Sequence, residues 1–394
     1  MGKRIIAIAL AAAITISLTA CSDNKGTSSN STPNEASSAE GETSSLESSA
    51  ESSSEETSES EILESTLSNP NASQNTIKLY NYIKDEVYHN KILSGQQEST
   101  WMDNNNEQYE FEYVFDKTGK YPAIRGLDYM NDDFEGVNRR AEDWYNRGGI
   151  VTICWHTGCD FNGSFDESQK TEIEDWDKAL TEGTDEYNKL IEGMDKGAKA
   201  LKELAEKDIP VIWRPFHELD GSWFWWSKGG AENFKKLWKL MYDRYTNHWE
   251  LNNLIWNLAY SGEAKENADW YPGDEYVDVT GLDTYSRGAH PEMYQAAYRV
   301  VGDRKPIAFH ECGTIPTPQE LREAKADWVW FMTWHTDYLT KEKRNDPNTL
   351  KEIYNDDYVI TLDELPTYNP DYKLADTSSG SEADSNAAES AVSE

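Results

Sequence analysis

The chain has 394 residues, and its 72 acidic and 37 basic side chains give a formal net charge of -35. This excess of acidic groups argues against nucleic-acid binding, because a phosphate backbone is neutralised by clustered Lys and Arg side chains. Beyond Cys21 there are three cysteines, Cys154, Cys159 and Cys312, an odd number without metal-ligand spacing. We therefore expect no disulfide framework, although the pairing of two of them is left open, and we expect neither a metal nor a cofactor.

The N-terminal residues 1–20 have the pattern of a secretory signal. Lys3 and Arg4 precede an apolar run from Ile5 to Leu18, which is too short for a comfortable membrane span. Cys21 follows small residues, which resembles the processing site of a bacterial lipoprotein, so we expect Cys21 to carry a lipid. This predicts a protein anchored in the membrane at the extracellular face of the bacterial cell. The alternative is an ordinary cleaved signal with an incidental cysteine, and hence a secreted protein.

Two segments lack the apolar residues needed to form a core. Residues 21–75 consist mostly of Ser, Glu, Thr, Asn and Ala, and a similar composition marks the C-terminal end. Such segments do not bury enough apolar surface to offset the entropy of ordering them. We predict a disordered linker over residues 21–75, one folded domain over residues 76–366 and a disordered tail over residues 367–394.

The folded part repeats a short apolar run followed by a longer polar or helical stretch. Helical spacing of apolar residues is clearest in residues 187–207 and 231–249. Near-continuous apolar runs separated by helices indicate buried parallel strands. Such runs begin near Ile92, Pro122, Ile150, Pro210, Asn253, Val277, Pro306 and Trp328.

Eight strand–helix units match the size of a closed (β/α)₈ barrel, an α/β fold also called the TIM barrel. The active site of such a barrel lies at the C-terminal ends of its strands. The alternative is an open, doubly wound sheet, which favours a glycine-rich loop after the first strand. Residues 93–97 offer one glycine there, so the barrel is the preferred prediction.

Polar residues stand at or near the predicted C-terminal strand ends. Alternation with a period of two places Ile212, Arg214, Phe216 and Glu218 on one strand face. An inward-facing Arg214 requires a carboxylate partner. Asp128 is interpreted as a structural group, and the choice between core packing and ligand contact is open for Trp225, Trp226 and Trp330. The residues at these strand ends are Asp128, His156, Glu218, Asp283, Tyr285, Glu311 and Trp334.

Two glutamates close predicted strands, Glu218 the fourth and Glu311 the seventh. Retaining glycosidases need two carboxyl groups about 5 to 5.5 Å apart, one protonated to assist the leaving group and one ionised to attack the anomeric carbon. Aromatic residues after Glu218 are expected to raise its pKa by desolvation, while Arg214 or Tyr285 holds Glu311 ionised. Their flat faces also suit the C–H faces of a pyranose ring. We therefore predict an acid/base pair that acts on sugars.

These residues carry a resemblance to a known family. Residues 214–218 (Arg-Pro-Phe-His-Glu) with residues 223–226 (Trp-Phe-Trp-Trp) resemble the acid/base signature of glycoside hydrolase family 26. Further segments that fit the family are Trp-His at 155–156, Gly-Leu-Asp-Thr-Tyr at 281–285 and His-Glu-Cys-Gly at 310–313. The resemblance covers about residues 76–366. It implies a (β/α)₈ barrel with the acid/base on the fourth strand and the nucleophile on the seventh.

The resemblance also implies a role for each matching residue. Glu218 would be the acid/base and Glu311 the nucleophile, with Tyr285 close to the nucleophile and Trp223 in the sugar subsites. Arg214 would support them. The residues expected to complete the pocket around the mannose at the cleavage point are His156, His217, Asp283 and Trp334.

The function predicted from these observations is that of an endo-acting β-1,4-mannanase. It would hydrolyse mannan, glucomannan or galactomannan by double displacement, as a monomer and without a metal. One alternative keeps the chemistry on mixed-linkage β-glucan or xylan. An alternative from another class is a non-catalytic glycan-binding lipoprotein, which would not need both glutamates. Tolerance of side branches, the number of subsites and the preference for internal or terminal bonds stay open.

Overall fold

A computed structural model describes residues 63–102, 106–262, 267–341 and 343–373 of the chain. The predicted signal at residues 1–20 and the predicted lipidation site Cys21 lie outside these residues. No helix in the described ranges is both long and apolar enough to cross a membrane. Cys154, Cys159 and Cys312, which all lie in this part of the chain, carry free thiols.

Eight parallel strands form a closed barrel, which confirms the predicted (β/α)₈ fold. The ring closes because β1 pairs with β8 on one side and with β2 on the other. Every strand begins within two residues of its predicted start. The strands are β1 (Ile92–Gln97), β2 (Ile124–Asp128), β3 (Ile150–Cys154), β4 (Val211–Arg214), β5 (Leu254–Ser261), β6 (Val279–Thr284), β7 (Ile307–Cys312) and β8 (Trp330–Thr333). A short ninth strand, β9 (Val359–Ile360), pairs with the start of β1.

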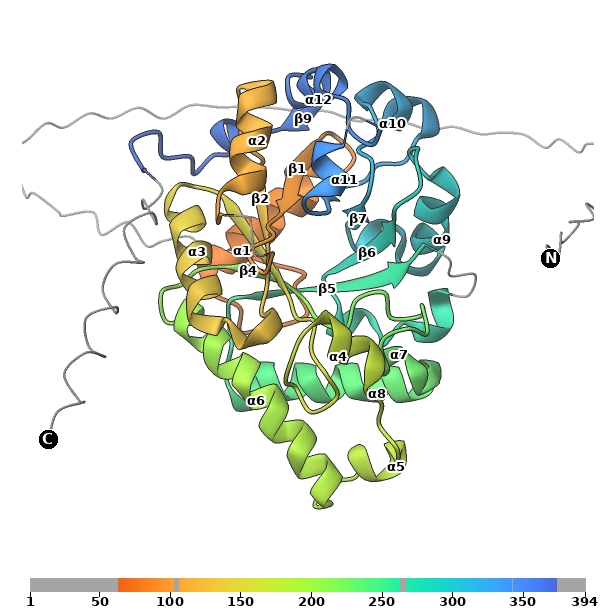
Figure 1. The fold of residues 1–394 in the computed structure, drawn as a ribbon. Helices are drawn as coiled ribbons and strands as arrows, with labels where there is room; N and C mark the ends of the chain where they lie inside the picture. Colours follow the sequence, from red (N-terminus) through yellow and green to blue (C-terminus); the bar gives the residue numbers. More distant parts are fainter. Residues whose placement is uncertain (1–62, 103–105, 263–266, 342, 374–394) are drawn as a thin grey trace, which may run out of the picture. The chain divides into compact units, whose positions relative to one another are not determined.

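Helices surround the strands, as Figure 1 shows. The longer helices are α1 (Gln74–Asn81), α2 (Tyr109–Thr118), α3 (Phe134–Asn146), α6 (Asp185–Ala205), α8 (Gly230–Asp243), α9 (Pro291–Val301), α10 (Pro318–Ala324) and α12 (Pro347–Tyr354). The short helices are α4 (Phe165–Lys170), α5 (Trp176–Ala179), α7 (Trp225–Lys228) and α11 (Asp337–Thr340). Since helices cover the outer face and side chains fill the interior, both strand faces are buried, which explains the near-continuous apolar runs.

The predicted helical connectors correspond to α6 and α8. Helix α6 begins where the sequence supplies an N-cap, because the Thr184 hydroxyl accepts a hydrogen bond from the backbone N–H of Tyr187. Its apolar stripe, which includes Leu190, Met194 and Leu201, is buried against the barrel. The remaining helical segments are two π-helical turns, Tyr82–Val87 and Arg244–His248, and the 3₁₀ turns Met130–Asp132, Asn267–Trp270, Asp274–Tyr276, Gly302–Arg304 and Leu362–Glu364.

The folded domain begins earlier than the predicted boundary at residue 75. The backbone N–H of Ser68 donates to Asp278 Oδ1 at 2.6 Å, and Asn69 Nδ2 donates to the carbonyl of Leu251 at 3.0 Å. Asn69 is buried by these contacts. The linker predicted over residues 21–75 was therefore drawn too long. Its last residues attach through hydrogen bonds of polar groups, and composition does not reveal such contacts.

The predicted tail, residues 367–394, also starts too early. The Thr367 hydroxyl donates to the carbonyl of Gly148 at 2.9 Å, and the Tyr372 hydroxyl donates to Asp143 at 2.8 Å. These contacts fix residues 367–373 on the end of α3 and the loop after it. A fragment cut at residues 76 and 366 would lose both sets of contacts, so experiments on this protein require the longer chain.

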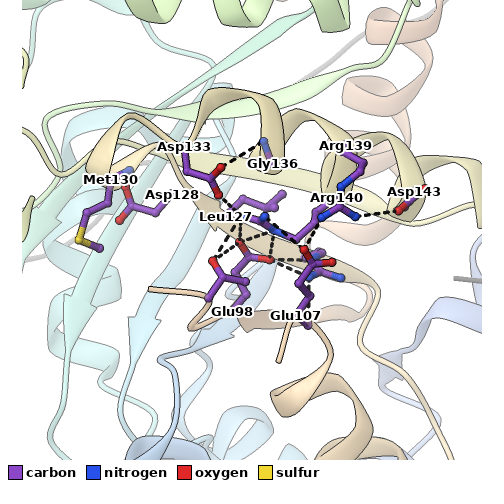
Figure 2. Close-up of polar contacts among 12 residues, drawn as sticks. Glu98, Glu107, Leu127, Asp128, Met130, Asp133, Gly136, Arg139, Arg140 and Asp143 are labelled. Carbon is purple, nitrogen blue, oxygen red and sulfur yellow. Dashed lines mark hydrogen bonds and ion pairs between the residues drawn. The ribbon is translucent and has the colours of Figure 1, made fainter. Parts of the chain in front are cut away.

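A buried charge cluster ties the loop after β1 to α3 (Figure 2). Glu98 directly follows β1 and is 0% exposed. Its carboxylate accepts hydrogen bonds from Arg125 Nη2 at 2.7 Å and from Arg140 Nε at 3.0 Å. Arg140 also binds Asp133, the N-cap of α3, at 3.1 Å. The sequence analysis did not single out this cluster, which holds one side of the rim where the strands end.

Candidate active site

A cleft of about 730 Å³ opens at the C-terminal ends of the strands. Arg214 lies beneath it, fully buried and bound to Glu311. The structure thus brings the predicted site residues together at one place, while the role of each stays a prediction. The predicted residues that line the cleft are His156, His217, Glu218, Trp223, Asp283, Tyr285, Glu311 and Trp334.

Glu311 lies near the end of β7 and accepts hydrogen bonds on both carboxylate oxygens. Arg214 Nη1 donates to Oε1 at 2.9 Å, and the Tyr285 hydroxyl donates to Oε2. A cationic donor and a hydroxyl donor both stabilise the negative charge of the carboxylate. The geometry therefore holds the Glu311 carboxylate in a fixed orientation.

Arg214, at the end of β4, supplies the positive charge of the site. Its Nη2 group pairs with Asp283 on β6 and donates to the carbonyl of His310 at 3.0 Å. Burial by itself lowers the pKa of Arg214, but the charges of Asp283 and Glu311 outweigh it and raise the pKa above its ordinary value. The guanidinium stays charged, and the predicted requirement for a carboxylate partner is met twice.

Glu218 lies beyond the end of β4 and has surroundings unlike those of Glu311. Trp223 Nε1 donates to its Oε2 at 2.5 Å. Burial, and then the negative charge of Glu311, raise the pKa of Glu218 to about 7, against the opposing effect of the Trp223 hydrogen bond and of the cations nearby. A carboxyl group with this pKa is partly protonated near neutral pH and can act as an acid.

The backbone at Glu218 is strained. Phe216 has a φ of 51° and Glu218 a φ of 50°, a left-handed conformation that costs free energy for residues with a Cβ atom. The turn is held from outside by the N–H of Leu219, which donates to the carbonyl of Ala259 at 3.2 Å. The N–H of Gly221 donates to the carbonyl of Glu218 at 2.9 Å and closes the turn. Neighbouring structure therefore fixes the direction in which the Glu218 side chain enters the cleft.

A hydrogen-bonded chain of three side chains runs beside the two glutamates. Asp128 Oδ2 lies 2.6 Å from His156 Nδ1, and His156 Nε2 lies 3.0 Å from His217 Nε2. Burial lowers the pKa of His156, but the Asp128 carboxylate outweighs it and raises the pKa. Burial, and then the charge of Arg214, lower the pKa of His217. Of the two rings, His156 is therefore the more basic, and Asp128, which we interpret as a structural group, lies where it orients the His156 ring.

The aromatic run after Glu218 divides into residues that line the cleft and residues that pack in the core. Trp223 and Phe224 line the cleft. Trp225 and Trp226 are fully buried and donate at 2.8 Å to the carbonyls of Thr157 and His217, respectively. Of the two possibilities left open by the sequence, core packing and ligand contact, the structure therefore shows core packing for these two residues. Trp330 is likewise buried on β8, where its Nε1 donates to His310 Nδ1 at 3.2 Å.

Asp128, Cys154 and His156 place potential metal-ligand atoms within 4.8 Å of one another. Burial raises the pKa of the Cys154 thiol well above its ordinary value, so the thiol keeps its proton. The Asp128 carboxylate accepts hydrogen bonds from the backbone of Met130 and from both the backbone and the ring of His156. These groups bind one another in a way that suits hydrogen bonding better than metal ligation.

Several cleft residues were missed at the sequence level. Phe165 and Gln169 on α4 line the cleft, and so do Ser261 and Tyr338. The sequence analysis searched the strand ends, whereas α4 lies in the connection between β3 and β4. The available signal was an aromatic residue directly after Ser164, which is the N-cap of α4.

Known proteins resemble this chain in sequence and fold. The family model of glycosyl hydrolase family 26 matches residues 68–364. A mannan endo-1,4-beta-mannosidase from Thermothelomyces thermophilus is 36% identical over 323 residues, which cover 77% of this chain and 64% of that protein. A mannan endo-1,4-beta-mannosidase B from Piromyces sp. is 32% identical, with 78% of this chain and 55% of that protein covered.

Among solved structures, that of a ruminal GH26 endo-beta-1,4-mannanase aligns with a TM-score of 0.72 at 33% sequence identity. The alignment covers 78% of this chain and 72% of that chain. The chain thus spans less than two thirds of the length of these two curated relatives, although it covers most of this solved structure. The family match over residues 68–364 shows that the chain belongs to glycosyl hydrolase family 26.

Proposed function

We propose that the protein is an endo-β-1,4-mannanase that cleaves mannan-type polysaccharides with retention of configuration. The observation that carries the proposal is the pairing of two unequal carboxyl groups in one cleft. Glu218 has a pKa of about 7, whereas Glu311 is bound by a cationic and a hydroxyl donor. Such a difference separates an acid from a nucleophile. The names of the curated relatives support mannan as the substrate.

In the first step the Glu311 carboxylate attacks the anomeric carbon of the sugar at the cleavage point. The bond from that carbon to the glycosidic oxygen breaks, and Glu218 gives its proton to the departing oxygen. A covalent mannosyl–enzyme ester on Glu311 and an ionised Glu218 remain. In the second step Glu218 takes a proton from a water molecule, the water oxygen bonds to the anomeric carbon, and Glu311 leaves as a carboxylate. Both residues return to their starting protonation states.

The surrounding residues serve these two steps. Arg214 and Tyr285 hold the Glu311 carboxylate in place, and the same contacts stabilise its charge when it is released. Trp223 keeps the Glu218 carboxyl directed into the cleft and offers an aromatic face beside it. His156 and His217 form a polar wall of the cleft, and the contact between their Nε2 atoms holds the two rings together.

The substrate is tested by incubating the purified chain with mannan, mixed-linkage β-glucan and xylan and measuring the reducing ends released. We expect release from mannan at least about tenfold above release from the other two polymers, because specificity rests on differential binding of the transition state. Faster release from β-glucan or xylan would contradict the mannan assignment. Binding to a polymer without release from any of the three would instead favour the non-catalytic glycan-binding function.

We also propose that Cys21 carries a lipid that holds the enzyme at the extracellular face of the cell membrane. The proposal rests on the sequence alone, namely the basic and then apolar residues 1–20 before Cys21. A polymer-degrading enzyme is useful there, because mannan does not enter the cell. A Cys21→Ser variant that stays with the membrane fraction as completely as the wild type would contradict it.

A further inference from the structure

The turn that carries Glu218 is attached to the end of β5 by a side chain as well as by the backbone. The backbone N–H of Leu219 donates to the carbonyl of Ala259 at 3.2 Å. Two residues further along β5, the backbone N–H of Ser261 donates to Asp220 Oδ1 at 2.8 Å. Asp220 therefore supplies a second point of attachment, two residues after Glu218.

The turn needs such attachment because its conformation is unfavourable by itself. Phe216, Glu218 and Ser222 have φ values of 51°, 50° and 65°, and none of the three is a glycine. Residues with a Cβ atom keep this left-handed conformation only where the surrounding structure holds them in it. The contacts of Leu219 and Asp220 with β5 lie between Glu218 and Ser222. We therefore expect the loss of either contact to let the turn relax, and the Glu218 side chain to move with it.

The same turn sets the contact between Glu218 and Trp223. An added Cβ atom at Gly221 would lie 2.2 Å from Cζ2 of Trp223, so the indole ring lies directly against the backbone of this glycine. From that place Trp223 Nε1 donates to Glu218 Oε2 at 2.5 Å. A shift of the backbone at Asp220 therefore displaces both partners of the hydrogen bond that directs Glu218 into the cleft.

The Asp220 side chain faces the protein and not the cleft. Among the described residues, the cleft is lined by Ser261, the partner of Asp220, but not by Asp220 itself, whose Oδ2 atom is buried. Burial raises the pKa of Asp220 above its ordinary value, against the effect of hydrogen bonds from the backbone and the hydroxyl of Ser261. The pKa of Glu218, by contrast, is raised by its own burial and then by Glu311. These contacts favour a geometric effect of Asp220 on Glu218 over an electrostatic one.

We propose that Asp220 is a positioning residue for the acid/base, because its hydrogen bond to the end of β5 holds the Glu218 carboxyl within reach of the glycosidic oxygen. This inference rests on the proposed function. Asp220 then affects the rate only as far as the leaving group needs a proton. A sugar hydroxyl leaves poorly without one, whereas a 2,4-dinitrophenolate ion is stable enough to leave unassisted. Removal of the Asp220 side chain should therefore slow the first kind of reaction and spare the second.

This dependence on the leaving group is measured as kcat/KM on mannohexaose and on 2,4-dinitrophenyl β-mannobioside. The constant reports the steps up to the covalent intermediate, in which Glu218 acts as an acid. For Asp220→Ala we expect a fall of about 30-fold on mannohexaose, which is part of the ~10²–10⁴-fold effect of a general acid, and of less than about twofold on the aryl substrate. Asp220→Asn keeps the Oδ1 acceptor and should restore most of the lost rate. Asp116→Ala removes an exposed aspartate from α2 and, as the matched control, should change neither constant.

A second measurement separates the positioning role from the enzymatic proposal. The indole N–H resonance of Trp223, identified by its loss in Trp223→Phe, is followed by ¹H–¹⁵N NMR of the ¹⁵N-labelled chain. Asp220→Ala should shift this resonance and Asp116→Ala should not, even if the wild-type chain does not hydrolyse mannan. If the alanine variant does not fold, Asp220→Glu gives the same test, because it displaces the acceptor by one methylene group.

The outcomes are distinguishable. A wild-type chain that is inactive on both substrates would contradict the proposed function, and the Trp223 resonance alone would then decide the role of Asp220. With an active chain, an equal fall of kcat/KM on both substrates, or no fall on either, would overturn the positioning role. An unshifted Trp223 resonance in Asp220→Ala would overturn it in both cases.

Discussion

Replacing Glu311 by alanine is expected to lower kcat on mannan by at least about 10⁴-fold while affinity for the polymer stays near the wild-type value. The variant has no carboxylate to form the covalent intermediate. The fold should survive, because the buried Arg214 keeps its ion pair with Asp283 after Glu311 is removed. Initial rates of reducing-end release and affinity electrophoresis in mannan-containing gels measure the two quantities.

Two controls belong to this experiment. Glu311→Gln keeps the shape of the side chain and removes its charge, so it should be as inactive as Glu311→Ala. Glu352→Ala removes a solvent-exposed glutamate from α12 and should leave kcat unchanged. If Glu311→Ala keeps more than a few per cent of wild-type activity, the assignment of the nucleophile is wrong.

The second large effect is expected in stability. Glu98→Ala should lower the free energy of unfolding by about 3–5 kcal/mol, because it leaves the buried guanidinium of Arg125 without its carboxylate and removes one of the carboxylates that Arg140 binds. Arg125 is 0% exposed and Arg140 is 4% exposed, and both donate to Glu98. Water does not reach these buried guanidinium groups and so cannot solvate their charge. Urea unfolding monitored by tryptophan fluorescence measures the change.

An exposed ion pair provides the matched control for Glu98. Lys235 Nζ lies 2.7 Å from Glu232 on the surface of α8, where the glutamate side chain is 81% exposed. Glu232→Ala should leave the urea midpoint close to that of the wild type, because water replaces the lost interaction. Equal urea midpoints for Glu98→Ala and Glu232→Ala would show that the buried cluster does not stabilise the domain.

Features that repeat along the chain were predictable from sequence. The apolar runs gave the eight strands, because parallel strands covered on both faces have few polar positions. Once Glu218 and Glu311 were placed at the ends of the fourth and seventh strands, the geometry of a closed barrel brought them to the same face. Arg214 was expected to find a carboxylate, and it binds both Asp283 and Glu311.

Features that depend on pairs of distant residues were not predictable. Glu98, Arg125 and Arg140 come from three separate segments and have no shared spacing. The packing of Trp225 depends on the carbonyl of Thr157, which lies 68 residues earlier in the chain. The domain ends were not predictable for the same reason, because a few hydrogen bonds to distant residues fix them. The place of α4 in the cleft was not predictable either, since it is marked by the single exposed ring of Phe165.

The central claim is that Glu311 and Glu218 act as a nucleophile and an acid in one retaining site. The most direct test is ¹H NMR of mannohexaose during hydrolysis by the wild-type chain, read before the new reducing ends mutarotate. Double displacement predicts that the β-anomer appears first and that the α-anomer grows in later. Initial formation of the α-anomer would show direct attack by water and would contradict the covalent role of Glu311.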